Sequence, residues 1–345
     1  MSLLWCDGFD HYGVTANLTE GAWAENTAQL SSVNPRTGAF HLRSAAATTT
    51  RRVLGGAKTT VGIGSVVYMN NLPLSNNSFA VYQFRDAANV DQISVIIQST
   101  GTIEVKRGPA GGTSLGVTAS PVVVAEAYQH IEALVFFSQT VGTVEVRVNG
   151  VTVFNVSGVD TVATSLVECS QVAICRTQGS CTADMDDVFC YDGLGSFNNT
   201  FLGDRRVLTL FPDANTVQAD WTVVGAATGY EAIDEASPDG DTSYITAGVP
   251  GSPGDISEFG IQNLPAGVSS VSGVVVVSMA RKTEAGPANT QWSVISGSFE
   301  AAGANTPMTE VYTYRQDVFE SDPGTGAPFT PTAVNDLEIK VERTQ

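Results

Sequence analysis

Carboxylate and imidazole side chains are the groups of this sequence that would do acid–base chemistry, and they are sparsely placed. The histidines titrate near neutral pH, but none lies in a serine or cysteine nucleophile motif; they are His11, His41 and His130. Carboxylates that cleave a glycosidic bond with retention would lie about 5 Å apart on one strand face, as in an E-x-D-x-x-E run. No such run occurs, and the nearest approaches are Glu145 with Arg147 and Asp184 with Asp186. The sequence therefore predicts no catalytic residue.

Acidic clusters raise the question of calcium, whose sites take about six to eight oxygen ligands from loops. The clusters are Asp7 with Asp10, Asp184 with Asp186 and Asp187, and the series Asp234, Glu235, Asp239 and Asp241. The last pair has suitable side chains but lacks the spacing of an EF-hand loop. We expect the group at 184–187 to cap strand ends and bond neighbouring backbone amides. The sequence thus predicts no metal and no cofactor, with loop-bound calcium as the alternative left open.

Aromatic rings bind sugars where they are exposed beside amides and carboxylates. The candidates are Tyr12, Trp23, Tyr68 and Trp292. Because alternating strands place most aromatic residues in the core, we expect these rings to be mainly buried. No sugar-binding residue is assigned from the sequence.

The cysteine pattern indicates free thiols rather than a metal module. The five cysteines are Cys6, Cys169, Cys175, Cys181 and Cys190, and their spacings match no usual zinc site. Synthesis in a cytoplasm keeps thiols reduced, so we expect them to be buried in strands.

The elements that position these residues are strands. Valines at 144, 146 and 148 alternate with charged residues, and Asn149-Gly150 then turns the chain into a second alternating run, which is a strong hairpin signal. Similar runs recur, whereas no apolar stripe at helical spacing spans three turns. Small and polar residues interrupt the rhythm at 193–200. We expect an all-β chain of two jelly-roll-like β-sandwich domains, 1–195 and 196–345, with strands that include 59–70, 128–137, 206–211, 230–234, 268–282 and 334–342.

Three segments of the first half carry a resemblance to a known fold. They are the hairpin 142–154, the run Asp186-Asp187-Val188-Phe189-Cys190-Tyr191-Asp192, and the opening Leu4-Trp5-Cys6-Asp7-Gly8-Phe9-Asp10. Together they resemble the concanavalin A-like (laminin G-like) lectin sandwiches over residues 1–195. The resemblance implies that Cys6 and Cys190 lie on neighbouring strands and are the pair to bridge if a disulfide forms. It also implies that His130 is a packing or hydrogen-bonded core residue.

An ordered series of motifs continues into the second half. It comprises Phe201-Leu202-Gly203-Asp204-Arg205-Arg206-Val207, Pro212-Asp213, Trp221-Thr222, Ile233-Asp234-Glu235 and Asp239-Gly240-Asp241-Thr242-Ser243-Tyr244. With the Asp-Gly-Phe-Asp opening, this series is similar to structural proteins of tailed bacteriophages and prophages, which have valine where this chain has Ile233. The resemblance implies a virion component, in a tail, a fibre, a spike or a capsid decoration.

Charge and hydropathy argue against certain classes of partner. The 35 acidic residues outnumber the 17 basic ones, for a net charge of −18, whereas a nucleic-acid surface needs clustered lysine and arginine. The opening residues lack the charged region of a signal peptide, and no apolar stretch is long enough to span a membrane. We expect no nucleic-acid partner, no membrane insertion, and assembly into a virion in the host cytoplasm.

These observations predict a non-enzymatic structural component of a bacteriophage virion. Sandwich edges with few charged residues are normally covered or paired, so we expect a homo-oligomer, with a trimer as first choice, bound to other virion proteins. A host cell-surface glycan is the further expected partner. Two alternatives stay open: a free carbohydrate-binding lectin-like protein, and a polysaccharide-degrading enzyme on a jelly roll.

Overall fold

The computed structural model describes residues 2–45, 48–74, 78–177, 181–218, 220–247 and 254–345. Strands make up 47% of the described residues and helices 4%. The pairings between named strands are antiparallel throughout the described ranges. The predicted all-β sandwich class is therefore confirmed.

The chain divides into two compact units whose boundary is not a single point. Unit 1 contains residues 1–10 and 23–207, and unit 2 contains residues 11–22 and 208–345. The later division thus follows Val207 rather than residue 195. An early segment, 11–22, leaves the first unit and belongs with the second, which nothing in its local sequence indicates.

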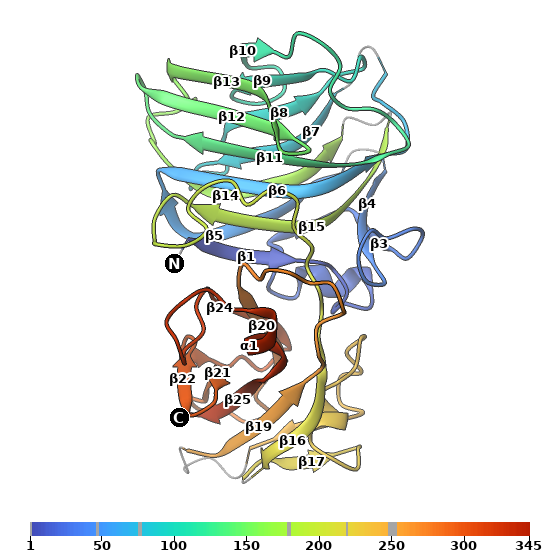
Figure 1. Ribbon diagram of the computed structural model, residues 1–345, viewed down its shortest axis with the longest axis vertical. Helices are drawn as coiled ribbons and strands as arrows, with labels where there is room; N and C mark the ends of the chain where they lie inside the picture. Colours follow the sequence, from blue (N-terminus) through green and yellow to red (C-terminus); the bar gives the residue numbers. More distant parts are fainter. Residues whose placement is uncertain (1, 46–47, 75–77, 178–180, 219, 248–253) are drawn as a thin grey trace. The chain divides into compact units, whose positions relative to one another are not determined.

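Unit 1 is built of two antiparallel sheets (Figure 1). The front sheet runs in the order β13 (Val151–Val159), β12 (Gly142–Val148), β11 (Tyr128–Phe136), β6 (Thr60–Met69), β15 (Thr182–Asp192), β4 (His41–Ala45), β3 (Gln29–Ser31), and β1 (Leu3–Asp7) also pairs with β15. The back sheet runs in the order β10 (Thr113–Val117), β9 (Ile103–Arg107), β8 (Asp91–Ile97), β7 (Phe79–Arg85), β14 (Cys169–Thr177), β5 (Thr50–Lys58), β2 (Glu25–Asn26).

The core of unit 1 lies between these sheets and includes a polar link that joins them at Tyr82. Val61, Ile63 and Phe84 are fully buried, as alternating strands require for their inward positions. The Ser65 hydroxyl lies 2.7 Å from the Tyr82 hydroxyl, which donates to the Ile131 carbonyl at 2.6 Å. A buried hydroxyl costs stability unless it is bonded, so this link satisfies both groups inside the core.

Two sequence predictions in unit 1 rest on strand placement and are confirmed. Asn149 and Gly150 have φ values of 50° and 79° and join β12 to β13, as an Asn-Gly hairpin turn requires. β1 pairs with β15, so Cys6 and Cys190 lie on neighbouring strands. Cys190 pairs with Trp5 and not with Cys6, so the two thiols are one register step apart and point to opposite faces. All five cysteines are free.

Unit 2 packs a six-stranded sheet against a two-stranded one. The larger sheet contains β16 (Pro212–Gln218), β19 (Ile256–Ile261), β25 (Leu337–Arg343), β21 (Asn289–Ser296) and β22 (Phe299–Ala302), with β23 (Thr306–Pro307) beside β21. The two-stranded sheets are β20 (Val274–Ala280) with β24 (Thr313–Phe319), and β17 (Thr222–Val224) with β18 (Tyr244–Thr246). Two 3-10 turns, Thr15–Thr19 and Tyr230–Ala232, and the helix α1 (Pro331–Asn335) complete it.

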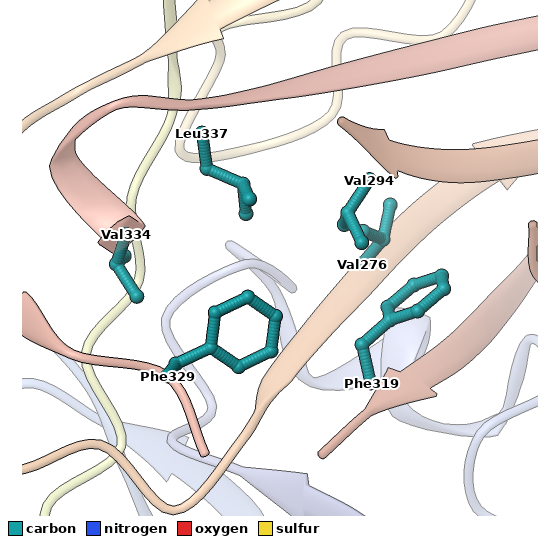
Figure 2. Close-up of a cluster of buried hydrophobic side chains, with 6 residues drawn as sticks. All are labelled: Val276, Val294, Phe319, Phe329, Val334 and Leu337. Carbon is teal, nitrogen blue, oxygen red and sulfur yellow. The ribbon is translucent and has the colours of Figure 1, made fainter. Parts of the chain in front are cut away.

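A compact apolar cluster forms the core of unit 2 (Figure 2). Val276 of β20 and Phe319 of β24 meet Val294 of β21 and Leu337 of β25, so both sheets contribute. The remaining members, Phe329 and Val334, come from α1 and the loop before it. Thr330 begins that helix by accepting a hydrogen bond from the Ala333 amide, with Pro331 in the first turn.

Three expected strands of the second half differ in the structure. Residues 206–211 form no strand, and β16 begins at Pro212. Residues 230–232 form a 3-10 turn. The expected strand 268–282 is limited to 274–280, and among the described strands it pairs with β24 and no other. In the first case the Val207 amide bonds the Asp187 side chain, and the amides of Leu202 and Gly203 just before it bond Glu132.

Candidate functional site

The outward face of the front sheet follows from its register. Ser65 of β6 contacts Tyr82 of the back sheet, so its neighbours Gly64 and Val66 point away from the back sheet. Residues paired with those two share the outward face, and they are Glu132 and His130 of β11 with Phe189 and Asp186 of β15. This face therefore gathers an imidazole and two carboxyl groups from two strands that are distant in sequence.

Two glycines make room on this face for aromatic rings. A Cβ atom at Gly64 would lie 2.3 Å from the Phe189 ring, and one at Gly62 would lie 2.1 Å from the Tyr191 ring. Both rings are buried. The Tyr191 hydroxyl donates to the Glu132 carboxylate at 3.0 Å. The glycines thus let β15 side chains lie across β6 and reach β11.

Residues 201–207, which we call the strap, are bonded to this face. The amides of Leu202 and Gly203 donate to the two oxygens of Glu132 at 2.8 and 3.0 Å. The Arg147 guanidinium lies 3.7 Å from the centre of the Phe201 ring, a favourable cation–π contact. Burial raises the pKa of Glu132, and the two amides oppose that shift. Both oxygens of the Glu132 carboxylate, which this face would otherwise present, therefore accept hydrogen bonds from the strap.

The C-terminal end of the strap is bonded to Asp187, one of two adjacent buried carboxyl groups. The Val207 amide donates to Asp187 at 2.8 Å, and the Arg36 guanidinium bonds Asp187 at 2.9 Å and Asp204 at 2.7 Å. Asp187 has a φ of 54° at a bulge of β15, which lets two successive carboxyl groups point to one side.

Asp186 and Asp187 are shielded from solvent and close to each other. Asp186 accepts hydrogen bonds from the amides of Arg36 and Thr37 at 3.0 Å each. Burial and then the neighbouring charge of Asp187 raise the pKa of Asp186 to about 8. As predicted, these carboxyl groups bond backbone amides, but they lie within β15 and not at a strand end.

His130 is buried on the same face and stacks on Phe189, with ring centres 6.0 Å apart. Neither ring nitrogen has a hydrogen-bond partner in the part of the chain that the structure describes. Burial lowers the pKa of His130 to about 4, so the ring is neutral at pH 7.

This burial predicts a loss of stability in acid. The unfolded chain protonates His130 near pH 6.5 and the folded chain only near pH 4, so its contribution is present above pH 6.5 and is lost as pH falls toward 4. We compare the free energies of unfolding in urea of the unsubstituted chain and of His130→Leu. When the pH is lowered from 7 to 4.5, the unsubstituted chain should lose about 2–3 kcal/mol more stability than the variant. The titration of all other groups affects both proteins equally and therefore cancels in this comparison. An unchanged difference would mean that the ring is not buried as a neutral group.

The other residues considered from the sequence lie in separate structural settings. Arg43 holds Asp184 at 2.7 and 2.8 Å, and His41 lies 3.3 Å from the same carboxylate. Tyr12 and Trp23 are fully buried, as expected of core aromatics. Among the described residues, no group of three or more histidine, cysteine, aspartate or glutamate side chains is placed to hold a metal ion. No described helix is long and apolar enough to cross a membrane.

A second candidate site is a groove that lies wholly within unit 2. Its walls come from residues 17–21 of the early segment and from residues 238–241, 279–281 and 310–313, and its volume is about 860 Å³. The Tyr314 amide donates to the Glu20 carbonyl at 2.8 Å, which attaches the early segment to β24. We call this site the groove.

One wall of the groove is a fixed group of planar polar side chains. Arg281 Nη2 bonds both oxygens of Asp241 at 2.8 Å, and the Tyr312 hydroxyl donates to the same carboxylate at 2.7 Å. The guanidinium lies 4.9 Å from the centre of the Tyr312 ring. These bonds lower the pKa of Asp241, with that from Tyr312 the larger cause. The Asp239-Gly240-Asp241 loop thus contributes an ion pair to the groove.

Sequence reasoning missed Arg281 and Tyr312 because each is an isolated residue in a loop or at a strand end. Asp241 was considered only as a calcium ligand. Pairing between β20 and β24 brings Arg281 and Tyr312 together, and Asp241 joins them through its hydrogen bonds to both. The only available signal was that a tyrosine and an arginine occur near opposite ends of two apolar strands, and that pattern is common.

Comparison with known proteins bears on the fold. No family model and no curated protein matches the chain. Similar solved structures include a sialidase (12% identity, TM-score 0.38), the alginate lyase Aly36B (9%, 0.38) and the carbohydrate-binding module CBM66 from Bacillus subtilis (8%, 0.34). They cover 55%, 56% and 50% of this chain, which in turn spans 18%, 96% and 97% of theirs. At these identities the likeness concerns the fold alone.

The comparison corrects one prediction. The chain was expected to be non-enzymatic, and this is contradicted because the similar structures include a sialidase and a lyase, which are enzymes. The expectation rested on the absence of a carboxylate run along one strand. A sheet face can instead gather its groups from several strands, as His130, Glu132 and Asp186 show.

Proposed function

We propose that this chain is a structural component of a tailed-bacteriophage or prophage virion that contacts a saccharide through the groove of unit 2. The support for saccharide binding is the composition and geometry of the groove. Saccharide sites combine an aromatic ring with a few fixed polar groups, and Tyr312, Arg281 and Asp241 provide that combination in a cavity of about 860 Å³. Their mutual bonds hold them in place before a ligand arrives, which lowers the entropy cost of binding.

The virion part of the proposal is supported by the ordered motif series of the sequence. One of those motifs, residues 201–207, is the strap that is bonded to Glu132, Asp187 and Arg36. These bonds hold the motif against the front sheet of unit 1. The further partners that we propose are other virion proteins and copies of this chain, with a trimer as first choice.

Binding is tested by a glycan array probed with the full chain, followed by titration of the glycans that bind. Tyr312→Ala and Arg281→Ala should each weaken binding by about tenfold or more, because each removes a wall of the groove. Arg107→Ala is the matched control, since its side chain is 33% exposed and paired with Asp160, much as the 30% exposed Arg281 is paired with Asp241. Binding unaffected by both groove variants would place the saccharide elsewhere.

The virion assignment has its own test. Antibody raised against the chain should detect it in purified particles of the phage or induced prophage that carries its gene. Its absence from purified particles, with presence in the lysate supernatant, would contradict the assignment and favour a free lectin-like protein.

A further inference from the structure

The charges that line the groove are mostly negative. Glu20, Asp241 and Glu310 contribute carboxylates against the single guanidinium of Arg281, a net charge of −2 within the described lining. The net charge of the whole chain, −18, has the same sign. An anionic ligand would enter against this field, whereas a neutral or cationic one would not.

The one cation of the groove is already engaged by a resident carboxylate. Arg281 Nη2 contacts both oxygens of Asp241 at 2.8 Å, and Tyr312 donates to the same carboxylate at 2.7 Å. A carboxylate or sulfate of a ligand would have to displace Asp241 to bond this guanidinium. The arrangement therefore resembles an occupied anion site.

Glu20 provides a hydrogen-bond acceptor to which no described residue donates. Its Oε2 atom is buried and has no hydrogen-bond partner among the described residues. The pairing of its carbonyl with the Tyr314 amide holds residue 20 against β24. A buried carboxylate oxygen left without a donor costs stability, and a hydroxyl or ammonium group that enters the groove would satisfy it.

We infer that the groove selects saccharides that present hydroxyl or amino hydrogens and carry no carboxylate, sulfate or phosphate. This inference rests on the proposed function and names the ligand class of the same site. Glu20 is the positioning acceptor, and the Arg281–Asp241 pair excludes anionic groups by occupying the cation.

The test uses the full chain and glycans in matched pairs: sialylated against desialylated cores, sulfated against unsulfated, and N-acetylated against free-amine hexosamine oligomers. In the first two pairs the uncharged member should bind about tenfold or more tightly than its anionic counterpart at low salt, and in the third pair the free amine should bind at least as tightly as the N-acetylated oligomer. Added salt should bring that ratio of affinities closer to one, because the discrimination is electrostatic.

Glu20→Gln keeps the shape and removes the charge. It should weaken binding of the uncharged glycans and reduce the discrimination against anionic ones, whereas the control Glu338→Gln, outside the groove, should change neither. Equal or tighter binding of the anionic members through the groove would overturn the inference and leave the proposed function standing. No binding to any glycan would overturn both.

Discussion

Replacing Arg36 with methionine is expected to lower the free energy of unfolding of unit 1 by about 3–5 kcal/mol, the range found when one partner of a buried ion pair is removed. Asp187 is fully buried, and Arg36 is the cation within 2.9 Å of it. Burial raises the pKa of Asp187 and Arg36 opposes that rise. Without the guanidinium the carboxyl must either stay ionised in a buried site or take up a proton.

This requirement gives the loss a definite pH dependence. Above the raised pKa the carboxyl is charged and unpaired, and below it a proton neutralises the carboxyl, so the loss should become smaller as the pH falls. Urea unfolding, with hydrogen exchange of β15 peptides to locate the effect in unit 1, measures both quantities. The same exchange data should show faster exchange at the Val207 amide, which donates to Asp187.

Asp204→Asn is the control for this experiment. It removes the other carboxylate that bonds Arg36, but the Asp204 side chain is 51% exposed, so the expected loss is about 0–1 kcal/mol. A loss below about 1 kcal/mol for Arg36→Met as well would show that Asp187 is not held as a buried charge.

Replacing Tyr12 with alanine should destabilise unit 2, although the residue comes from the early part of the chain. Tyr12 is fully buried, and its ring meets that of Tyr314 in β24 at 5.1 Å in an edge-to-face arrangement. Truncating a buried aromatic residue costs about 3–5 kcal/mol. Hydrogen exchange should therefore accelerate in β20 and β24 while β6 and β15 keep their protection.

Val14→Ala tests whether position in the segment alone matters. Val14 is 51% exposed, so its replacement should change stability by no more than about 0.5 kcal/mol. Loss of protection in β6 and β15 upon Tyr12→Ala would contradict the assignment of residues 11–22 to unit 2.

Much of the strand content follows from local pattern. The alternation at 142–148 and the Asn149-Gly150 turn predict β12, β13 and the link between them, because a left-handed turn and a period of two are properties of a few adjacent residues. The apolar run at 128–137 predicts a strand, and β11 occupies Tyr128–Phe136 between β6 and β12. The acidic residues at 186 and 187 were expected to bond backbone amides, and they do.

Local pattern predicted the wrong structure where backbone amides bond side chains that are distant in sequence. Residues 206–211 alternate as a strand would, but the Val207 amide bonds Asp187, and the amides of Leu202 and Gly203 bond Glu132. These carboxylates lie 20 to 71 residues away in sequence. No propensity of the strap itself indicates that its hydrogen bonds are made by side chains of a sheet face.

The sequence by itself determined the all-β class, the hairpin at Asn149-Gly150 and the acidic charge, and its resemblance to the lectin sandwiches implied that the strands of Cys6 and Cys190 are neighbours. The tertiary structure alone decided that His130, Glu132 and Asp186 share one face, that residues 11–22 belong to unit 2, and that Glu20, Arg281 and Tyr312 line one groove. The physical reason is one of range. Turn conformation and alternation depend on adjacent residues, whereas a site depends on which distant strands pair and in what register, and a shift of one residue would turn every side chain to the other face.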